Sequence, residues 1–197
     1  MLSYEESLKI LKDTEALIDG HFILSSGLHS SQYVQCAKLL SKPDKAELLC
    51  QSLAEKIKLS FNEFDLILSP AMGGIIIGYE MGRILNKETI FSERANNKFE
   101  LRRNFIIKKK QKVLIVEDVI TTGKSSLECA KLVDEAEAEI VGYACIIDRS
   151  KNKSLIKKKI ISQIELNIPT YSKDKLPDNL KSIEAVKPGS RPKNEKN

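Results

Sequence analysis

Apolar residues along the chain follow two patterns that predict different secondary structures. Short, nearly continuous apolar runs are typical of buried strands and occur at residues 64–69, 88–94, 112–118, 139–150 and 161–167. Apolar residues spaced three or four apart predict amphipathic helices at residues 3–18, 43–58 and 124–136, with a further helix that ends near Leu85. Because strands and helices alternate, we expect an α/β fold built on a doubly wound, mostly parallel sheet.

Three segments depart from this alternation. Residues 20–36 look like two short strands around a Ser/Gly turn. Residues 95–103 are polar, contain the turn pair Asn96-Asn97 and predict a hairpin or a mobile loop. Residues 187–197 are rich in Pro, Gly and Lys, and we expect them to form a frayed tail.

Composition is that of a single globular domain. The 197 residues are 42% hydrophobic and 30% charged, and no apolar run reaches the roughly 18–20 residues that span a bilayer. The acidic, amphipathic N-terminus does not resemble a signal peptide, so we expect a cytoplasmic protein. The four cysteines lie far apart with no C-x-x-C pair, which argues against a zinc site and favours reduced, buried thiols.

The net charge of +5 and the lysine runs at residues 108–110 and 157–159 raise the question of nucleic-acid binding. Aromatic residues make up only 6% of the chain and do not interleave with these runs. We therefore interpret the runs as solvated faces that attract polyanionic small substrates in a general way. We expect neither a nucleic-acid partner nor a membrane partner.

The segment VLIVEDVITTGKSS, residues 113–126, carries the most specific chemistry. Its Gly-Lys-Ser ending resembles a P-loop, but the first glycine of G-x-x-x-x-G-K-[ST] would fall on Asp118. A carboxylate at that point would face the phosphates of a nucleoside triphosphate, so this interpretation fails. No G-x-G-x-x-G dinucleotide fingerprint occurs in the chain either.

The segment instead suits a single phosphate. Residues 121–125 lead from a strand into a helix, and the amides and dipole of a helix start bind one phosphate well. Thr121, Thr122 and Ser125 add hydroxyl donors, and Gly123 allows the backbone to approach closely. Ligands of doubly wound sheets bind at the carboxyl ends of the strands. We therefore expect the loops after Ser69, Asp118 and Asp148 to converge there.

Two acids, Glu117 and Asp118, stand directly before this turn. Carboxylates accept hydrogen bonds from vicinal hydroxyls, and a phosphate beside a diol is a ribose 5-phosphate. A plain strand-to-helix turn with capping hydroxyls would explain the threonines and the glycine. It would not explain two adjacent acids at the end of a buried strand.

This arrangement of four apolar residues, Glu-Asp, two apolar residues and Thr-Thr-Gly resembles the phosphoribosyl diphosphate signature of the type I phosphoribosyltransferases. The blocks GHFILSSGLHSSQYVQCA, SPAMGGIIIGYEMGR, FSERANNKFELRRNF and CIIDRS are similar to the orotate phosphoribosyltransferases of that family, in their bacterial short-loop form. The resemblance implies one phosphoribosyltransferase domain over residues 1–197. Its core would span about 43–167, and a small hood would comprise about 18–36 together with a C-terminal segment.

The resemblance also assigns binding roles by position. Phosphoribosyl diphosphate would be bound by Met72, Gly73, Arg94, Glu117, Asp118, Val119, Ile120, Thr121, Thr122, Gly123, Lys124 and Ser125. Orotate would be bound by Ser26, Gly27, Tyr33, Thr121 and Arg149. Arg149 makes independent sense because a guanidinium can grip a carboxylate bidentately. The alternatives are a surface arginine that ends a strand and, for Tyr33, a half-buried strand residue.

The catalytic residues implied are Arg94, Lys98 and Asp118. Residues 95–103 match a mobile loop that closes over the diphosphate, often from the partner subunit of a homodimer. The alternative for Lys98 is a solvated lysine in a polar loop. In the pyrophosphate loop the resemblance implies a cis peptide between Ala71 and Met72, where the alternative is a simple turn.

The implied activity transfers the phosphoribosyl group of 5-phosphoribosyl 1-diphosphate to orotate, giving orotidine 5′-monophosphate and diphosphate in UMP biosynthesis. The anomeric carbon would pass through an oxocarbenium-like state, stabilised by orientation and by cations at the leaving group. The implied cofactor is Mg²⁺, bound mainly through the substrate, with Asp118 as the one protein ligand considered.

Two departures and two alternatives qualify this interpretation. Many relatives carry a lysine where this chain has Ser25, and an aromatic-lysine pair where it has Met72-Gly73. The first alternative is a purine phosphoribosyltransferase, although the hood-like block here is N-terminal. The second is a non-catalytic phosphoribosyl-binding regulator, which would need an added DNA-binding module.

Overall fold

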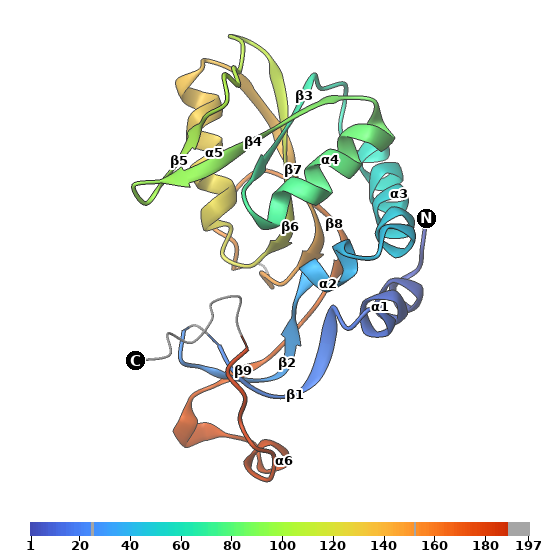
Figure 1. Ribbon diagram of the computed structural model, residues 1–197, viewed down its shortest axis with the longest axis vertical. Coiled ribbons are helices and arrows are strands. Elements are labelled where there is room, and N and C mark those ends of the chain that lie inside the picture. The colour runs from blue at the N-terminus through green and yellow to red at the C-terminus, as the bar shows by residue number, and fades with distance from the viewer. Residues whose placement is uncertain (25, 152, 189–197) are drawn as a thin grey trace.

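The computed structural model describes residues 1–24, 26–151 and 153–188, so Ser25 and residues 189–197 of the expected tail lie outside the described residues. The core strands are β3 (Leu66–Pro70), β4 (Glu88–Ala95), β5 (Lys98–Leu101), β6 (Lys112–Ile120), β7 (Glu139–Asp148) and β8 (Ile160–Glu165). They form one sheet in the order β5-β4-β3-β6-β7-β8 (Figure 1). All neighbours run parallel except β5, which pairs antiparallel with β4. The predicted α/β class and mostly parallel sheet are confirmed.

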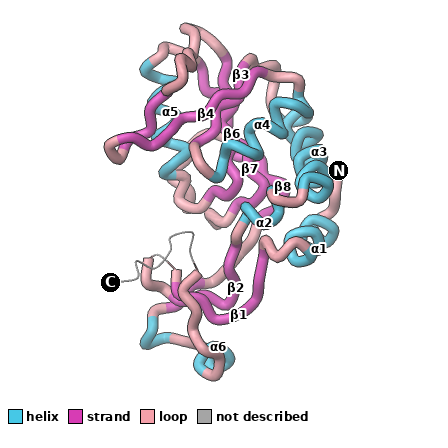
Figure 2. Tube along the Cα trace, in the orientation of Figure 1, coloured by secondary structure: helices cyan, strands magenta, loops and turns pink. Residues whose placement is uncertain are grey.

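Helices cover both faces of this sheet (Figure 2). α3 (Pro43–Ser60) and α4 (Gly73–Leu85) pack into one apolar cluster, which includes Leu114 of β6. α5 (Lys124–Glu135) packs into a second cluster, which includes the next residue, Ile115. Because adjacent residues of β6 join different clusters, this strand is buried on both faces. Burial on both faces explains the continuous apolar run in its sequence.

The first helix, α1 (Tyr4–Asp13), is shorter than the predicted helix over residues 3–18. It begins with a capping box, in which the Ser3 hydroxyl accepts from the Glu6 amide and the Glu6 carboxylate accepts from the Ser3 amide. It ends because Glu15 takes a left-handed conformation with φ 57°. Leu17 and the residues after it belong to strand β1. The helical spacing of Leu17 relative to the apolar residues of α1 is therefore a coincidence.

The other predicted boundaries agree with the sequence to within a few residues, except that the strand predicted at 112–118 continues to Ile120, so the two acids lie within β6 and not at its end. Four short elements were not expected, because two to five residues are too few to show a period: α2 (Cys36–Leu40), β9 (Thr170–Tyr171), the 3-10 helix η1 (Lys173–Lys175) and α6 (Asp178–Lys181). The hairpin predicted within 95–103 is present as the turn between β4 and β5.

A second, smaller sheet lies below the core in Figure 1. It consists of β1 (Leu17–Ile23), β2 (His29–Val34) and β9 (Thr170–Tyr171), all antiparallel. On the other edge of β1, Ile23 N–H donates to the Val186 carbonyl and Val186 N–H donates to the His21 carbonyl, both at 2.8 Å. Segments from both halves of the chain therefore build this sheet.

A pair of buried histidines ties this sheet to the segment that follows it. His21 Nδ1 lies 2.9 Å from the Ile183 carbonyl oxygen, and His21 Nε2 lies 2.7 Å from His29 Nδ1. A carbonyl oxygen only accepts, so His21 Nδ1 carries the proton of the first bond. In the neutral pair His21 Nε2 then accepts from His29 Nδ1, which fixes the tautomer of both rings.

The remaining general expectations concern membranes and cysteines. None of the described helices combines the length and the apolar character that a membrane crossing requires. All four cysteines are free and buried, as predicted. The described residues contain no group of three or more His, Cys, Asp or Glu arranged to hold a metal ion.

Candidate active site

The three loops expected to meet at the carboxyl edge of the sheet do so. The loop after β7 is tied to β6, because Arg149 N–H donates to the Ile120 carbonyl at 2.8 Å. The same loop reaches the turn after β6, where Leu155 N–H donates to the Thr122 carbonyl at 3.0 Å. The loop after β3 approaches so closely that a Cβ on Gly73 would lie 2.8 Å from an Asp118 carboxylate oxygen.

The turn between β6 and α5 has the geometry of an anion site. Gly123 caps the helix with φ +77°, a left-handed conformation that suits glycine. The helix begins at Lys124, and its first backbone bond runs from the Leu127 amide to the Gly123 carbonyl. The amides of the first turn therefore point out of the helix end. Thr121 and Thr122 are exposed at this turn, and the Lys124 amide donates to the Thr122 hydroxyl at 3.4 Å, so the Thr122 hydroxyl lies beside these amides.

The two acids of β6 point to opposite faces of the sheet. Glu117 faces α5, where Ser126 donates its hydroxyl proton to the carboxylate. Asp118 faces α4, beside Gly73. Burial raises the pKa of Glu117 to about 7, although the hydrogen bond from Ser126 lowers it in part. Burial also raises the pKa of Asp118 above its ordinary value. Both carboxyl groups therefore release their protons at a higher pH than exposed acids do.

The loop after β3 contains the cis peptide that the resemblance implies, between Ala71 and Met72. Its position is fixed by β4, because Ala71 N–H donates to the Ser92 carbonyl at 2.8 Å. Met72 is 83% exposed and Gly73 opens α4. This loop and the turn at Gly123 are both helix starts, and they flank Asp118.

Arg149 directly follows β7, and Tyr33 lies on β2 of the smaller sheet. Burial lowers the pKa of the Arg149 guanidinium, and the electrostatic influence of Tyr33 raises it in part. Arg149 Nε is buried and has no hydrogen-bond partner among the described residues. The Tyr33 hydroxyl donates to Gln35 at 2.9 Å. The expected orotate residues Ser26 and Gly27 lie in the exposed turn between β1 and β2, where Gly27 has φ +81°.

The hairpin of β4 and β5 directs Arg94 toward α5. Arg94 Nη2 lies 2.7 Å from a Glu128 carboxylate oxygen, and Arg94 Nη1 donates to the Asn97 carbonyl at 2.9 Å. Its guanidinium also lies 4.2 Å from the centre of the Phe99 ring. Lys98, at the start of β5, is exposed. The diphosphate roles of Arg94 and Lys98 stay predictions, and in this arrangement Arg94 binds groups of its own chain.

Sequence reasoning missed the partners that hold these residues. Ser126 and Glu128 lie on α5, one directed at Glu117 and the other at Arg94. Arg103, the second arginine of the RR pair, makes two 3.0 Å hydrogen bonds to Glu93 across the hairpin. The one local sign of these contacts was that Ser126, a polar residue, lies in the buried stripe of α5. Their partners on the strands, Glu117 and Arg94, lie farther away in the sequence.

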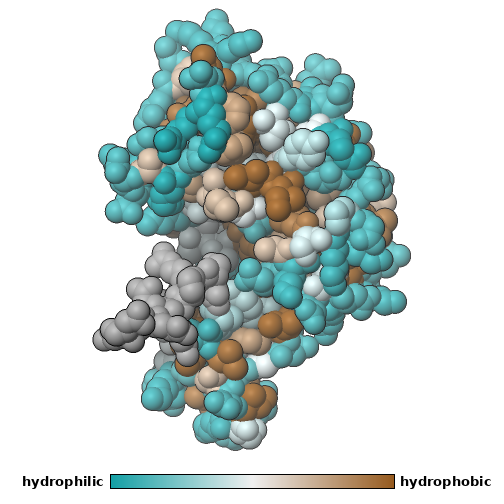
Figure 3. Space-filling view, in the orientation of Figure 1, coloured by the Kyte–Doolittle hydropathy of each residue, from teal (hydrophilic) through white to brown (hydrophobic). Residues whose placement is uncertain are grey.

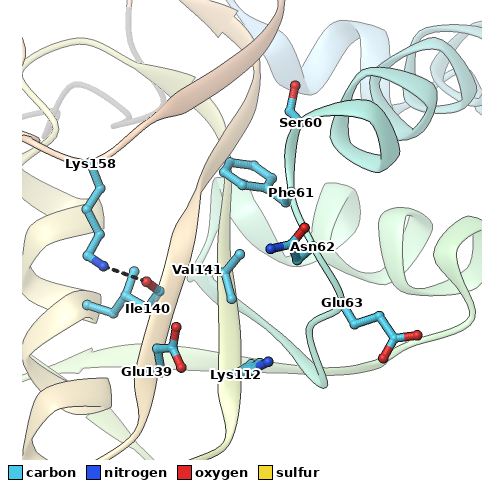
Figure 4. A pocket seen from close by; sticks show the side chains of 9 residues that line it. All are labelled: Ser60, Phe61, Asn62, Glu63, Lys112, Glu139, Ile140, Val141 and Lys158. Carbon is cyan, nitrogen blue, oxygen red and sulfur yellow. Dashed lines mark hydrogen bonds between the residues drawn. The ribbon is translucent and has the colours of Figure 1, made fainter.

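A cavity of about 270 Å³ lies at the amino ends of the central strands, away from the loops described above (Figure 4). Lys112 and Glu139, the first residues of β6 and β7, line it. Lys158 turns its ammonium group to the Ile140 carbonyl, at 2.8 Å. The chemistry-bearing loops are therefore at the other end of the strands.

Comparison with known proteins agrees with this geometry. The phosphoribosyl transferase domain family matches residues 39–174, which is more than half of the chain. The chain belongs to the phosphoribosyltransferase family. A phosphoribosyltransferase of Novosphingobium aromaticivorans, named orotate phosphoribosyltransferase, is 45% identical over 190 residues, covering 96% of this chain and 98% of that protein. A protein of the same name from Erythrobacter litoralis is 44% identical, with the same shares covered.

Solved phosphoribosyltransferases share the fold. Orotate phosphoribosyltransferase from Aeropyrum pernix has a TM-score of 0.70 and 21% identity, and the match covers 80% of this chain and 92% of that chain. Adenine phosphoribosyltransferase from Thermoanaerobacter pseudethanolicus has a TM-score of 0.59 and 19% identity, over 68% of this chain and 88% of that chain. At these identities the likeness concerns the fold alone. The phosphoribosyltransferase fold that the sequence predicted is confirmed.

Proposed function

We propose that this phosphoribosyltransferase transfers the phosphoribosyl group of 5-phosphoribosyl 1-diphosphate to orotate. The products are orotidine 5′-monophosphate and diphosphate, in the synthesis of UMP. The observation that carries this proposal is the half-buried side chain of Arg149, whose buried Nε lacks a partner among the described residues. The similarity to relatives named orotate phosphoribosyltransferase, over nearly the whole chain, supports the same substrate.

Arg149 recognises the carboxylate of orotate in this proposal. A half-buried guanidinium makes stronger charge-assisted hydrogen bonds than an exposed one, and its fork fits a carboxylate. Tyr33, on β2, offers an aromatic face to the pyrimidine ring in this proposal. An unpaired buried donor is costly, and a bound carboxylate relieves that cost. Purine bases have no carboxylate to offer.

The sugar phosphate occupies the turn at Gly123. The amides at the start of α5 and the hydroxyls of Thr121 and Thr122 bind the 5-phosphate. Asp118 and Glu117 accept hydrogen bonds from the ribose hydroxyls, and those bonds favour the ionised carboxylates over the neutral forms. Ionised carboxylates then stabilise the positive charge that develops on the ribose ring as the diphosphate leaves. Orientation and charge suffice, and no covalent nucleophile is needed.

Mg²⁺ suits the chemistry of this edge, because Asp118 supplies hard oxygen donors next to the loop at Gly73. We propose that Asp118 holds the ion together with oxygens of the substrate. When bound, Mg²⁺ neutralises charge on the diphosphate. Arg94 and Lys98 add positive charge at the same leaving group.

A homodimer accounts for the apolar face of α4. Met72, Ile76 and Tyr79 lie on one side of this helix and are 83%, 53% and 69% exposed. Figure 3 shows hydrophobic side chains gathered over α4 on this face. Contiguous exposed apolar residues mark protein interfaces, and this face continues into the loop at Met72, where a partner's hairpin would arrive. We propose that a second copy of the chain covers this face.

We also propose that the protein is located in the cytoplasm. Recovery of the protein in a membrane pellet would contradict this location.

The test of substrate identity is the change in ultraviolet absorbance when orotate is consumed. The purified protein with Mg²⁺ and phosphoribosyl diphosphate should consume orotate and leave adenine and hypoxanthine unchanged. Arg149→Ala should raise KM for orotate by about 30-fold or more, since truncating one partner of a buried charge pair costs about 2–5 kcal/mol. Arg149→Lys, which keeps the charge but loses the fork, should fall between.

KM for phosphoribosyl diphosphate is the internal control for these variants, and it should stay within about twofold of the wild-type value. Turnover of a purine base by the wild-type protein would refute the substrate assignment. An unchanged KM for orotate in Arg149→Ala would refute the role of this residue.

A further inference from the structure

The hairpin arginine that is expected to meet the diphosphate is already neutralised within its own chain. Arg94 Nη2 lies 2.7 Å from Glu128 and Nη1 donates to the Asn97 carbonyl at 2.9 Å, while the flat face of the guanidinium covers the Phe99 ring at 4.2 Å. These contacts leave several of the five N–H donors of the guanidinium free, so a diphosphate can approach it. It then competes with Glu128 for the positive charge.

Glu128 is the contact that a diphosphate would replace. It is the only anion on Arg94 among the described residues, and a phosphate oxygen occupies the same position on a guanidinium as a carboxylate oxygen. The Asn97 carbonyl and the Phe99 ring belong to the same hairpin as Arg94, and Phe99 is buried in the apolar cluster that includes α5, so both keep their places. Glu128 belongs to α5, the helix whose start forms the phosphate turn, so the Arg94 guanidinium leaves it when the arginine side chain turns.

The space beneath the hairpin permits such a movement. A cavity of about 490 Å³ lies between the hairpin and α5, lined by residues 97–100 on one side and by Glu128, Lys131, Leu132 and Glu135 on the other. The side chains at the hairpin tip therefore have space to turn, while Phe99 keeps β5 packed on α5.

We infer that Glu128 is a resting counter-ion for Arg94, which holds the guanidinium over α5 until a diphosphate takes it. This inference rests on the proposed function, because it assumes that Arg94 binds the diphosphate. Glu128 touches no substrate and acts through Arg94, so it is a positioning residue. Its carboxylate competes with the diphosphate and thereby weakens the binding of phosphoribosyl diphosphate.

The test measures the affinity for inorganic diphosphate by calorimetry, with wild type, Glu128→Gln, Arg94→Ala and the double variant. Glutamine keeps the shape of the side chain and removes the charge that holds Arg94. A partly exposed ion pair contributes at most about 1 kcal/mol, so Glu128→Gln should bind diphosphate about threefold to fivefold more tightly. In the Arg94→Ala background the same change should have no effect on the affinity, because the arginine for which Glu128 and the diphosphate compete is absent.

Glu135→Gln is the matched control, since it removes an equal charge from the same side of α5. It should leave the affinity unchanged, which separates competition for Arg94 from a general loss of negative charge. Thermal unfolding of each variant checks that the fold persists. For phosphoribosyl diphosphate in the full reaction, KM should fall in Glu128→Gln while kcat does not rise, which a merely structural role would not produce.

Several results would overturn the inference. They are an unchanged or weaker affinity in Glu128→Gln, an equal gain in Glu135→Gln, a gain that persists without Arg94, and a wild-type protein that does not bind diphosphate. A wild-type protein that binds diphosphate normally but does not consume orotate would instead count against the proposed substrate alone.

Discussion

The raised pKa of Glu117 predicts how the stability of the protein depends on pH. Its pKa is about 7 in the folded chain, against the ordinary glutamate value of 4.5 that applies to the unfolded chain. Between these two values the folded protein retains a proton that the unfolded protein has released. Stability therefore falls as the pH rises through this window, because the unfolded state binds fewer protons. Above the folded pKa the loss is complete.

The size of the effect follows from the shift. A difference of about 2.5 pKa units corresponds to about 3 kcal/mol, at 1.36 kcal/mol for each unit. Glu117→Gln removes the titration and keeps an oxygen that can accept from Ser126. From about pH 5 to about pH 8, the stability of the variant should therefore gain about 2–3 kcal/mol relative to wild type. For a chain of this length that gain corresponds to about 5–10 °C in relative Tm.

The assay is urea unfolding of both proteins at about pH 5, 6.5 and 8, without substrate and with a chelator to exclude divalent cations. Glu135→Gln is the control, since this exposed helix residue should show no such trend. A stability difference between Glu117→Gln and wild type that stays constant across this pH range would refute the reasoning. It would mean that Glu117 is ionised in the folded chain and well solvated.

Two further predictions concern catalysis and assembly. Asp118→Asn should lower turnover of orotate by more than tenfold, with an unchanged circular dichroism spectrum, because the amide loses the negative charge beside the reacting sugar; full turnover in this variant would contradict the role of the acid. Ile76→Glu places a charge in the apolar face of α4 and should convert the proposed dimer to a monomer in analytical ultracentrifugation; Leu59→Glu, at an exposed apolar residue on α3, is the control that should leave the assembly intact.

Much of the core was predictable from local sequence because its elements are buried in simple ways. β6 is buried on both faces, so its apolar run is unbroken, and the polar residues that follow it must lie at an edge of the sheet. Because β3 and β7 were predicted to run parallel to β6, the loops that follow them were expected at the same end of the sheet as the turn after β6. α3 carries a proline in its first turn, and the position of that proline gave its start.

The features that were not predicted depend on contacts between distant parts of the chain. α1 ends at a left-handed residue, Glu15, that no propensity marks, because glutamate favours helix. The ion pair of Arg94 with Glu128 joins residues of two different elements, and the sequence gives no sign of it. The opposite directions of Glu117 and Asp118 follow only once β6 is known to extend beyond them.

The construction of the smaller sheet bears on the order in which the protein matures on the ribosome. The core strands are complete once β8 has emerged, with Glu165 as its last residue. β1 and β2, which carry Tyr33, precede the core strands in the chain, yet they pair with Tyr171 and Val186, which follow them. A nascent chain can thus assemble its phosphate turn early, while the wall of the base site waits for residues synthesised some time later. Translational pausing within this interval should therefore yield a folded core with the proposed sugar site in place and the proposed base site still incomplete.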